Sequence, residues 1–159
     1  MSPTVHASAV LVGARAVLIR GPSGSGKSKL AGELIASAHH NGPGPGFGRL
    51  VGDDRVHLQA AHGRLLVRPA ETLAGLLEVR GVGVRRVAHE PAAVVGLVVD
   101  LGATDAERLP QAEQQRCEIE GVILPRLAVA AGAAALPAVL ALLTSGQPPA
   151  HFPAGAIRS

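Results

Sequence analysis

The residues best suited to chemistry lie near the start of the chain, where glycine, serine and lysine alternate. Residues 21–28 read Gly-Pro-Ser-Gly-Ser-Gly-Lys-Ser, a complete G-x-x-x-x-G-K-[ST] pattern. Its glycines let successive backbone N–H groups turn toward a phosphate, its lysine supplies a full positive charge, and its final hydroxyl suits Mg²⁺. We therefore expect a nucleotide-binding loop made of Gly21, Ser23, Gly24, Ser25, Gly26, Lys27 and Ser28.

The segments on either side of this loop are the ones that the pattern requires. An apolar run over 16–19 predicts a strand that leads into the loop, and the apolar spacing over 30–38 predicts the helix that follows it. The positive N-terminal end of such a helix attracts phosphate. A glycine-rich turn between strand and helix also occurs without any ligand, but these residue types at these offsets favour binding of a nucleoside triphosphate.

Acidic residues at three places are candidates to complete a phosphate-transfer site. Asp53 and Asp54 follow a short predicted strand, and two adjacent carboxylates beside a polyphosphate resist ionising together, so one is a candidate proton acceptor. Asp100 ends a long apolar run, as a Walker B aspartate would. Glu78 is either a metal ligand near a phosphate-binding Arg80 or half of an ion pair on an edge strand. An aspartate at a strand end can also simply stabilise a turn.

Length and composition confine these features to one domain. The chain has 159 residues, of which 47% are hydrophobic, so it can bury one core of ordinary size and not two. Its only aromatic residues are two phenylalanines, too few to stack single-stranded nucleic acid, and we expect no nucleic-acid partner. Because the chain has one cysteine, no signal-peptide pattern and no apolar stretch of membrane-spanning length, we expect a cytoplasmic protein that does not contact the membrane.

The predicted elements describe an α/β fold, a single P-loop nucleotide-binding domain with a mixed β-sheet flanked by helices. We expect a hairpin of strands over 5–12 and 16–20, strands over 49–52, 56–58, 65–68 and 93–100, a shorter strand ending near Leu124, and a second helix over 136–143. The expected catalytic domain covers residues 1–146, and a proline-rich, weakly ordered tail covers 147–159. Residues 41–46 are expected to form a surface loop.

Four segments, taken in order, resemble the HPr kinase/phosphorylase family. They are Val5-His6-Ala7, the loop 21–28, Leu50-Val51-Gly52-Asp53-Asp54, and Leu76-Leu77-Glu78-Val79-Arg80-Gly81-Val82-Gly83-Val84. The last segment is very close to the family signature Leu-Leu-Glu-Ile-Arg-Gly-Leu-Gly-Ile. The resemblance implies a bacterial serine kinase that uses ATP and Mg²⁺ to phosphorylate HPr, the phosphocarrier protein of the sugar phosphotransferase system, on a regulatory serine.

The same resemblance gives roles to six residues. They are Asp54 as the base that takes the serine proton, His6 as the active-site histidine, Lys27 as the ligand of the β- and γ-phosphates, Ser28 and Glu78 as Mg²⁺ ligands, and Arg108 as a catalytic arginine after the central strand. Longer members carry an N-terminal domain ahead of this one, so the resemblance implies the short form, a catalytic core. It also implies a homo-oligomer, with a hexamer among the forms that the family adopts.

One family segment departs from its pattern here. The family sequence Pro-Val-Arg-Pro-Gly-Arg, associated with removal of the phosphate, has Leu124-Pro125-Arg126-Leu127 near its place. We therefore expect phosphorylase activity to be feeble.

Two other functions stay open on the residues alone. A small-molecule P-loop kinase would use Asp100 as its Walker B acid and would need an arginine-rich lid, for which Arg80, Arg85 and Arg86 are the candidates. A nucleotide-binding regulatory module without turnover would keep the loop and lose the catalytic base, yet Asp54 is present.

Overall fold

Most of the strands, which are four to nine residues long, form where apolar residues predominate, and two stretches rich in alanine and leucine form the helices. The structure is a computed structural model that describes residues 3–38 and 47–145. The expected surface loop over 41–46 and the expected tail over 147–159 lie outside the described residues.

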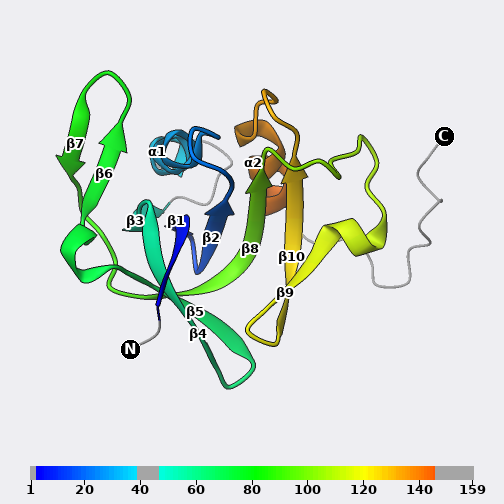
Figure 1. The fold of residues 1–159 in the computed structure, drawn as a ribbon, viewed down its shortest axis with the longest axis horizontal. Coiled ribbons are helices and arrows are strands. Elements are labelled where there is room, and N and C mark those ends of the chain that lie inside the picture. The colour runs from blue at the N-terminus through cyan, green and yellow to red at the C-terminus, as the bar shows by residue number, and fades with distance from the viewer. Residues whose placement is uncertain (1–2, 39–46, 146–159) are drawn as a thin grey trace.

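Ten strands, two α-helices and two short 3₁₀ helices follow one another in the described part of the chain (Figure 1). Their bounds are β1 (Thr4–Val12), β2 (Arg15–Arg20), α1 (Lys27–Ala38), β3 (Gly48–Gly52), β4 (Arg55–Ala61), β5 (Arg64–Pro69), η1 (Glu71–Leu73), β6 (Leu76–Val79), β7 (Gly83–Arg86), β8 (Ala93–Leu101), η2 (Ala112–Gln115), β9 (Arg116–Ile119), β10 (Val122–Val129) and α2 (Leu136–Ser145).

The main sheet mixes parallel and antiparallel pairs, as expected from the sequence. Its strand order is β2-β1-β4-β5-β8-β10-β9, with β3 also paired to β1 and β2 also paired to β8, so the sheet curls back on itself. The expected hairpin of β1 and β2 is present, and β2 lies parallel to β8, which lies parallel to β10. Strands β6 and β7 form a separate antiparallel hairpin.

One edge of β1 changes partner along its length, and this change shapes the site described below. Residues 4–6 pair with β4, whereas residues 9–12 pair with β3, and the register shifts between Ala9 and Val10. Strands β3 and β4 therefore follow each other along the same edge of β1. The two residues between them, Asp53 and Asp54, lie where the ladder is interrupted.

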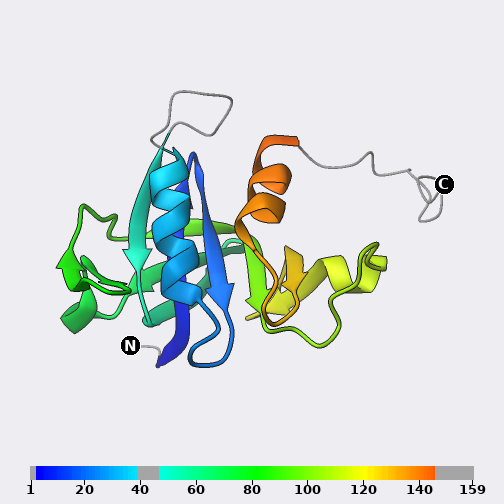
Figure 2. The ribbon, with the colours of Figure 1, turned by 90° about the horizontal axis from the view of Figure 1, so that it is seen from above.

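Apolar side chains fill two clusters, one on each face of the curled sheet. One cluster packs α1, through Leu30 and Leu34, and α2, through Val139, against the strands, and Figure 2 shows the two helices over that face. The other cluster lies inside the curl, where Val56 and Leu65 of β4 and β5 meet residues of β1, β2 and β8. Neither described helix is long and apolar enough to span a membrane.

The expectation of one shorter strand ending near Leu124 is wrong. This region contains two strands, and β10 continues through Pro125 to Val129. Proline is tolerated because β10 changes partner there: Val122–Pro125 pair with β9, and residues 126–129 pair with β8. A proline at the end of one ladder removes no N–H that the next ladder needs.

Candidate active site

The glycines of the loop 21–28 hold backbone conformations that other residues rarely adopt. Gly24 and Gly26 have φ values of 80° and 101°. A Cβ atom on Gly21 would lie 2.6 Å from Ser25 Oγ, so the loop closes on itself too tightly for a larger residue at that position. The loop therefore needs glycine for its shape, as the sequence predicted.

Two polar side chains of the loop, those of Lys27 and Ser25, have hydrogen-bond donors that no protein group satisfies in the described residues. The buried Lys27 side chain folds back, and its Nζ donates to the carbonyl oxygens of Gly21 (2.8 Å) and Pro22 (3.1 Å). An ammonium group has three donors, so one is left for a ligand. Ser25 Oγ is buried and finds no hydrogen-bond partner within the described residues. An orphaned hydroxyl beside a charged donor fits a phosphate group, which would accept from both.

Asp53 is a buried carboxylate held by three donors from three elements. Ser28 Oγ, in the first turn of α1, lies 2.8 Å and 2.9 Å from its two oxygens. Ser8 Oγ of β1 donates to Oδ1 at 2.6 Å, and the backbone N–H of Glu78 in β6 donates to Oδ2 at 3.1 Å. The sequence separates these residues widely, but the fold brings them together on the carboxylate beside the loop.

Asp54 has the opposite surroundings, because a tight turn separates it from its neighbour. Its φ is 70°, and the N–H of Arg55 donates to the carbonyl oxygen of Asp53 at 2.8 Å, which closes a three-residue turn. The side chain of Asp54 is 63% exposed, whereas Asp53 as a residue is 5% exposed. The turn therefore directs one carboxylate inward to α1 and leaves the other open to an incoming molecule.

His6 is the partner of the exposed carboxylate. Its Nε2 lies 2.8 Å from Asp54 Oδ1, and its side chain is 34% exposed. His6 and Ser8 are two positions apart on β1 and so point to the same face of the strand. The structure thus brings together His6 and Asp54, which the sequence analysis placed in one site.

The donors beside the loop suit a hard cation that also binds phosphate. No group of three or more His, Cys, Asp or Glu side chains forms a metal cage among the described residues. Mg²⁺ is commonly held by one or two carboxylates and a hydroxyl, with substrate phosphates and water completing its shell. Ser28 together with Asp53 would supply such a pair of ligands.

Glu78 lies beside this pair, but the structure fixes only its backbone there. Its side chain is exposed, and it makes no ion pair with Arg80 in the described part of the chain. Arg80, Arg85 and Arg86 are all exposed on the β6–β7 hairpin and its turn. The hairpin meets the site through the backbone of Glu78, and its Leu77 lies in the core cluster that also contains Leu30 and Leu34 of α1.

The carboxylate of Asp100 is hydrogen-bonded to two arginines. Arg20 donates from Nε to Oδ1 at 2.7 Å and from its terminal nitrogen to Oδ2 at 2.9 Å, and Arg126 Nε donates to Oδ2 at 2.6 Å. Partial burial alone would raise the pKa of Asp100, but these hydrogen bonds outweigh it and hold the pKa below its usual range. Both oxygens therefore serve to join β2, β8 and β10.

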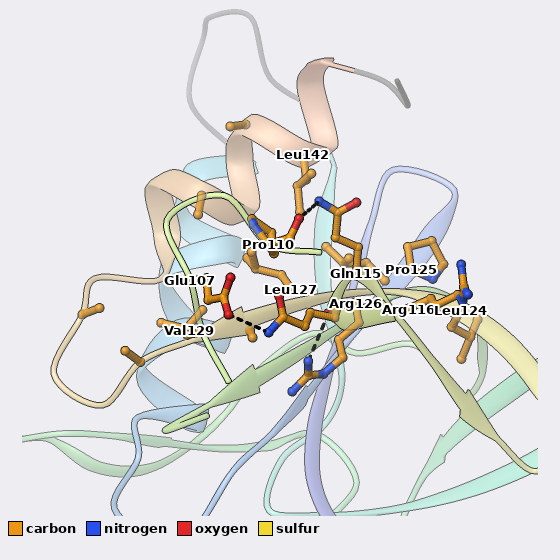
Figure 3. A pocket seen from close by; sticks show the side chains of 18 of the residues that line it. Glu107, Pro110, Gln115, Arg116, Leu124, Pro125, Arg126, Leu127, Val129 and Leu142 are labelled. Carbon is orange, nitrogen blue, oxygen red and sulfur yellow. Dashed lines mark hydrogen bonds between the residues drawn. The ribbon is translucent and has the colours of Figure 1, made fainter. Parts of the chain in front are cut away.

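Arg108 lies in the loop that follows β8. It lines a hollow of about 930 Å³ that Glu107, Pro110, Gln115 and α2 also border (Figure 3). No hydrogen bond or ion pair links Arg108 to the phosphate loop, His6 or Asp54 in the residues that the structure describes. The catalytic role given to Arg108 by family resemblance stays a prediction.

Sequence reasoning missed Ser8 altogether and gave Asp53 no contact with Ser28. Each residue has a feature in the sequence that could have pointed to it. Ser8 is a polar residue in an apolar strand, on the same face as His6, and Asp53 is the acid nearest the end of β3. Neither signal reveals the contacts, because these join residues 25 and 45 positions apart.

Comparison with known proteins places the chain in a family. Residues 1–139 match the HPr Serine kinase C-terminal domain family. The HPr kinase/phosphorylase of Geobacillus thermodenitrificans is 34% identical over 142 residues, which cover 81% of this chain and 43% of that protein. The enzyme of the same name from Streptococcus thermophilus strain LMD-9 is 45% identical over 82 residues, 51% of this chain and 24% of that protein.

A solved structure shares the fold. The HPr(Ser) kinase/phosphatase from Coxiella burnetii superposes with a TM-score of 0.67 at 22% identity, covering 89% of this chain and 93% of that one. The chain belongs to the HPr Serine kinase C-terminal domain family. It spans between a quarter and a half of the length of the curated relatives described above.

Proposed function

We propose that the protein is a serine kinase that transfers the γ-phosphoryl group of ATP, with Mg²⁺, to a regulatory serine of an HPr-type phosphocarrier protein. The observation that carries this proposal is the unequal exposure of Asp53 and Asp54 beside a complete phosphate loop. A kinase that acts on another protein needs one carboxylate at the nucleotide and a second one that a folded substrate can reach. Membership of the HPr Serine kinase C-terminal domain family supports the choice of HPr as that substrate.

The proposed roles follow from what each side chain contacts. Lys27, the loop amides and Ser25 hold the phosphates, and they stabilise the charge that spreads over the γ-phosphoryl group during transfer. Ser28 and Asp53, with Glu78 from the family assignment, would hold Mg²⁺. When bound, Mg²⁺ neutralises charge on the β- and γ-phosphates.

Asp54 is the proposed general base. Its exposed carboxylate accepts the proton of the incoming serine hydroxyl, while His6 fixes the orientation of that carboxylate through the 2.8 Å hydrogen bond. Protein groups form no covalent bond to the phosphoryl group in this scheme. Catalysis rests on positioning and on charge stabilisation.

The geometry at Asp100 argues against the small-molecule kinase. A Walker B acid must face the hydroxyl of the loop serine, and Asp53 does so at 2.8 Å. Asp100 instead binds Arg20 and Arg126 with both of its oxygens. The regulatory module without turnover is disfavoured because Asp54 keeps both its exposure and its histidine partner.

The proposal covers the forward reaction in the cytoplasm. Arg126, the arginine in the segment that replaces the family's phosphate-removing sequence, is tied to Asp100 and Asp105. We therefore expect removal of phosphate from phosphoserine-HPr to be feeble. The homo-oligomer expected from family resemblance stays a prediction.

The deciding experiment compares Asp54→Asn with Asp100→Asn. We expect Asp54→Asn to lower transfer to HPr by roughly 10²–10⁴-fold, the usual effect of losing a general base, with ATP affinity nearly intact. Asp100→Asn should be much milder, because Asp100 faces arginines and not the nucleotide. Transfer is measured as acid-stable phosphoserine on HPr, located by mass spectrometry, and ATP affinity by titration of a fluorescent ATP analogue.

The opposite ranking, with Asp100 essential and Asp54 dispensable, would overturn the assignment in favour of a Walker B kinase. Binding of Mg-ATP by the wild-type protein without phosphorylation of HPr or any tested phosphocarrier would support the regulatory module.

A further inference from the structure

Ser8 carries a completely buried hydroxyl at the centre of the site. It has no exposed surface, and it lies in β1 among apolar residues. Its Oγ contacts Asp53 Oδ1 at 2.6 Å and the backbone nitrogen of Asp54 at 3.2 Å. One oxygen atom therefore touches both of the neighbouring aspartates.

The two contacts fix the direction of the hydroxyl proton. The backbone N–H of Asp54 is a donor only, so Ser8 Oγ accepts that bond with a lone pair. A hydroxyl has a single hydrogen, which is then free to point only at Asp53 Oδ1. Asp53 Oδ1 is the acceptor of this bond, which fixes the orientation of the carboxyl group. Ser8 therefore holds the Asp53 side chain in the position where it faces Ser28.

The same hydroxyl also accepts a backbone hydrogen bond at the point where the β-ladder of β1 is interrupted. The edge of β1 passes from β4 to β3 at this point, and Asp54 takes a φ of 70° in the turn between them. In that turn the N–H of Asp54 has no backbone acceptor among its described hydrogen bonds, and Ser8 Oγ takes that role. The carbonyl oxygen of Asp54 keeps its ladder bond, from the N–H of Ala7 at 3.1 Å.

We propose that Ser8 is a positioning residue that gives the two aspartates different tasks. Its hydroxyl holds the side chain of Asp53 toward Ser28, the proposed cation ligand. It also holds the backbone of Asp54, so that the side chain of Asp54 faces the acceptor hydroxyl. This inference rests on the proposed kinase function. His6 acts beside it on the same face of β1, because it holds the side chain of Asp54 whereas Ser8 holds the backbone.

The test uses Ser8→Ala, with Ala9→Gly as a matched control. Each variant loses one buried heavy atom from the same strand, but Ala9 belongs to the apolar cluster inside the curl and contacts no aspartate side chain in the described hydrogen bonds. We expect Ser8→Ala to raise the Mg²⁺ concentration for half-maximal transfer and to lower kcat, each by roughly 10–100-fold, the usual effect of removing a group that orients a metal ligand.

Three further measurements separate positioning from a general loss of structure. The KM for HPr and the affinity for the ATP analogue in EDTA should stay within about twofold of wild type, because Lys27 and the loop are untouched. Ser8→Thr, which restores a hydroxyl, should recover most of the Mg²⁺ dependence. Ser8→Cys, with a weak donor in the same place, replaces Ser8→Ala if that variant does not fold.

Distinct results would contradict distinct claims. If folded Ser8→Ala shows the Mg²⁺ dependence and kcat of Ala9→Gly, Ser8 has no positioning role. The same conclusion follows if Ser8→Thr keeps the wild-type melting temperature yet stays as impaired as Ser8→Ala. If the wild-type protein itself neither binds Mg-ATP nor phosphorylates HPr, the kinase proposal fails, and the role of Ser8 fails with it.

Discussion

Two identical side chains, adjacent in the chain, receive opposite environments in this protein. Asp53 lies against the first turn of α1, and Asp54 opens to solvent, because the turn between them reverses the side-chain direction. A left-handed conformation at a residue other than glycine costs about 1–2 kcal/mol. The hydrogen bonds from Arg55 and Ala7 hold Asp54 in it, so local strain accompanies the separation of the two carboxylates.

At the scale of residues, Glu78 and Asp53 are the two carboxylates proposed to hold Mg²⁺. We predict that replacing them affects the stability of the fold differently. Glu78→Gln should raise the Mg²⁺ requirement for transfer while leaving the melting temperature unchanged, because its side chain is exposed. Asp53→Asn should raise the Mg²⁺ requirement and also destabilise the fold by roughly 1–3 kcal/mol, since an amide NH₂ would then face buried donors. Mg²⁺ titration of activity and thermal unfolding measure the two effects.

An unchanged Mg²⁺ dependence in Glu78→Gln would return Glu78 to a surface role on its hairpin. Asp53 and Ser28 would then be the only protein ligands in the proposal.

At the scale of elements, the ion pairs around Asp100 join three strands at the end where the phosphate loop begins. Arg20 is the last residue of β2, Asp100 lies near the end of β8, and Arg126 lies in β10. Arg126 also donates two hydrogen bonds to the carboxylate of Asp105, at 2.7 Å and 3.0 Å. The loop after β8 therefore belongs to the same network. The network thus braces the base of the phosphate loop from the side opposite α1.

This network predicts a definite loss of stability in acid. Because the folded-state pKa of Asp100 lies below its ordinary value of 3.8, its contribution is present above pH 3.8 and is lost as the pH falls through the folded-state pKa. Asp100→Asn should therefore be less stable than wild type at pH 7, and the difference should shrink as the pH falls below 3.8 and through the folded-state pKa of Asp100. Urea unfolding at several pH values measures it, and a difference that is constant with pH would contradict the assignment.

Elements defined by neighbouring residues could be read from the sequence, whereas contacts between distant elements could not. The strand, loop and helix around residues 16–38 follow from local pattern, and the structure confirms them. Strand β9 escaped prediction because its four residues alternate too briefly to give a period. The bond from Ser28 to Asp53 depends on how β3 packs beside α1, which no local pattern specifies.

The candidate site shows the same division. Family resemblance placed His6 and Asp54 in one site, and the structure joins them at 2.8 Å. It did not reveal the inward aspartate or its serine, because their meeting results from the change of partner along β1. A sequence pattern records residue types and spacing, but not an interrupted ladder.

At the scale of the whole molecule, ligand binding should appear as added stability. Mg-ATP at 100 times its Kd should stabilise the fold by about 2.7 kcal/mol, which for a chain of this size is a rise in melting temperature of about 5–10 °C. Lys27→Met should abolish this rise, because the buried ammonium group is the loop's charged phosphate donor.

Lys29→Met is the matched control, since Lys29 is exposed two positions further along α1 and should keep the full rise. A rise of equal size in all three proteins would place nucleotide binding outside the loop. Thermal scanning with and without Mg-ATP provides the measurement.

The parallel pairing of β2 with β8 has a consequence for how this protein is made. Arg20 and its partner Asp100 are 80 residues apart, so at about 5–20 residues per second a ribosome needs about 4–16 s to supply the second after the first. During that interval β1, β2 and the phosphate loop have emerged, but the strand that must lie beside them has not been synthesised. The phosphate loop is thus translated several seconds before the strand that pairs with β2, so the Arg20–Asp100 contact at its base forms only after β8 has been made.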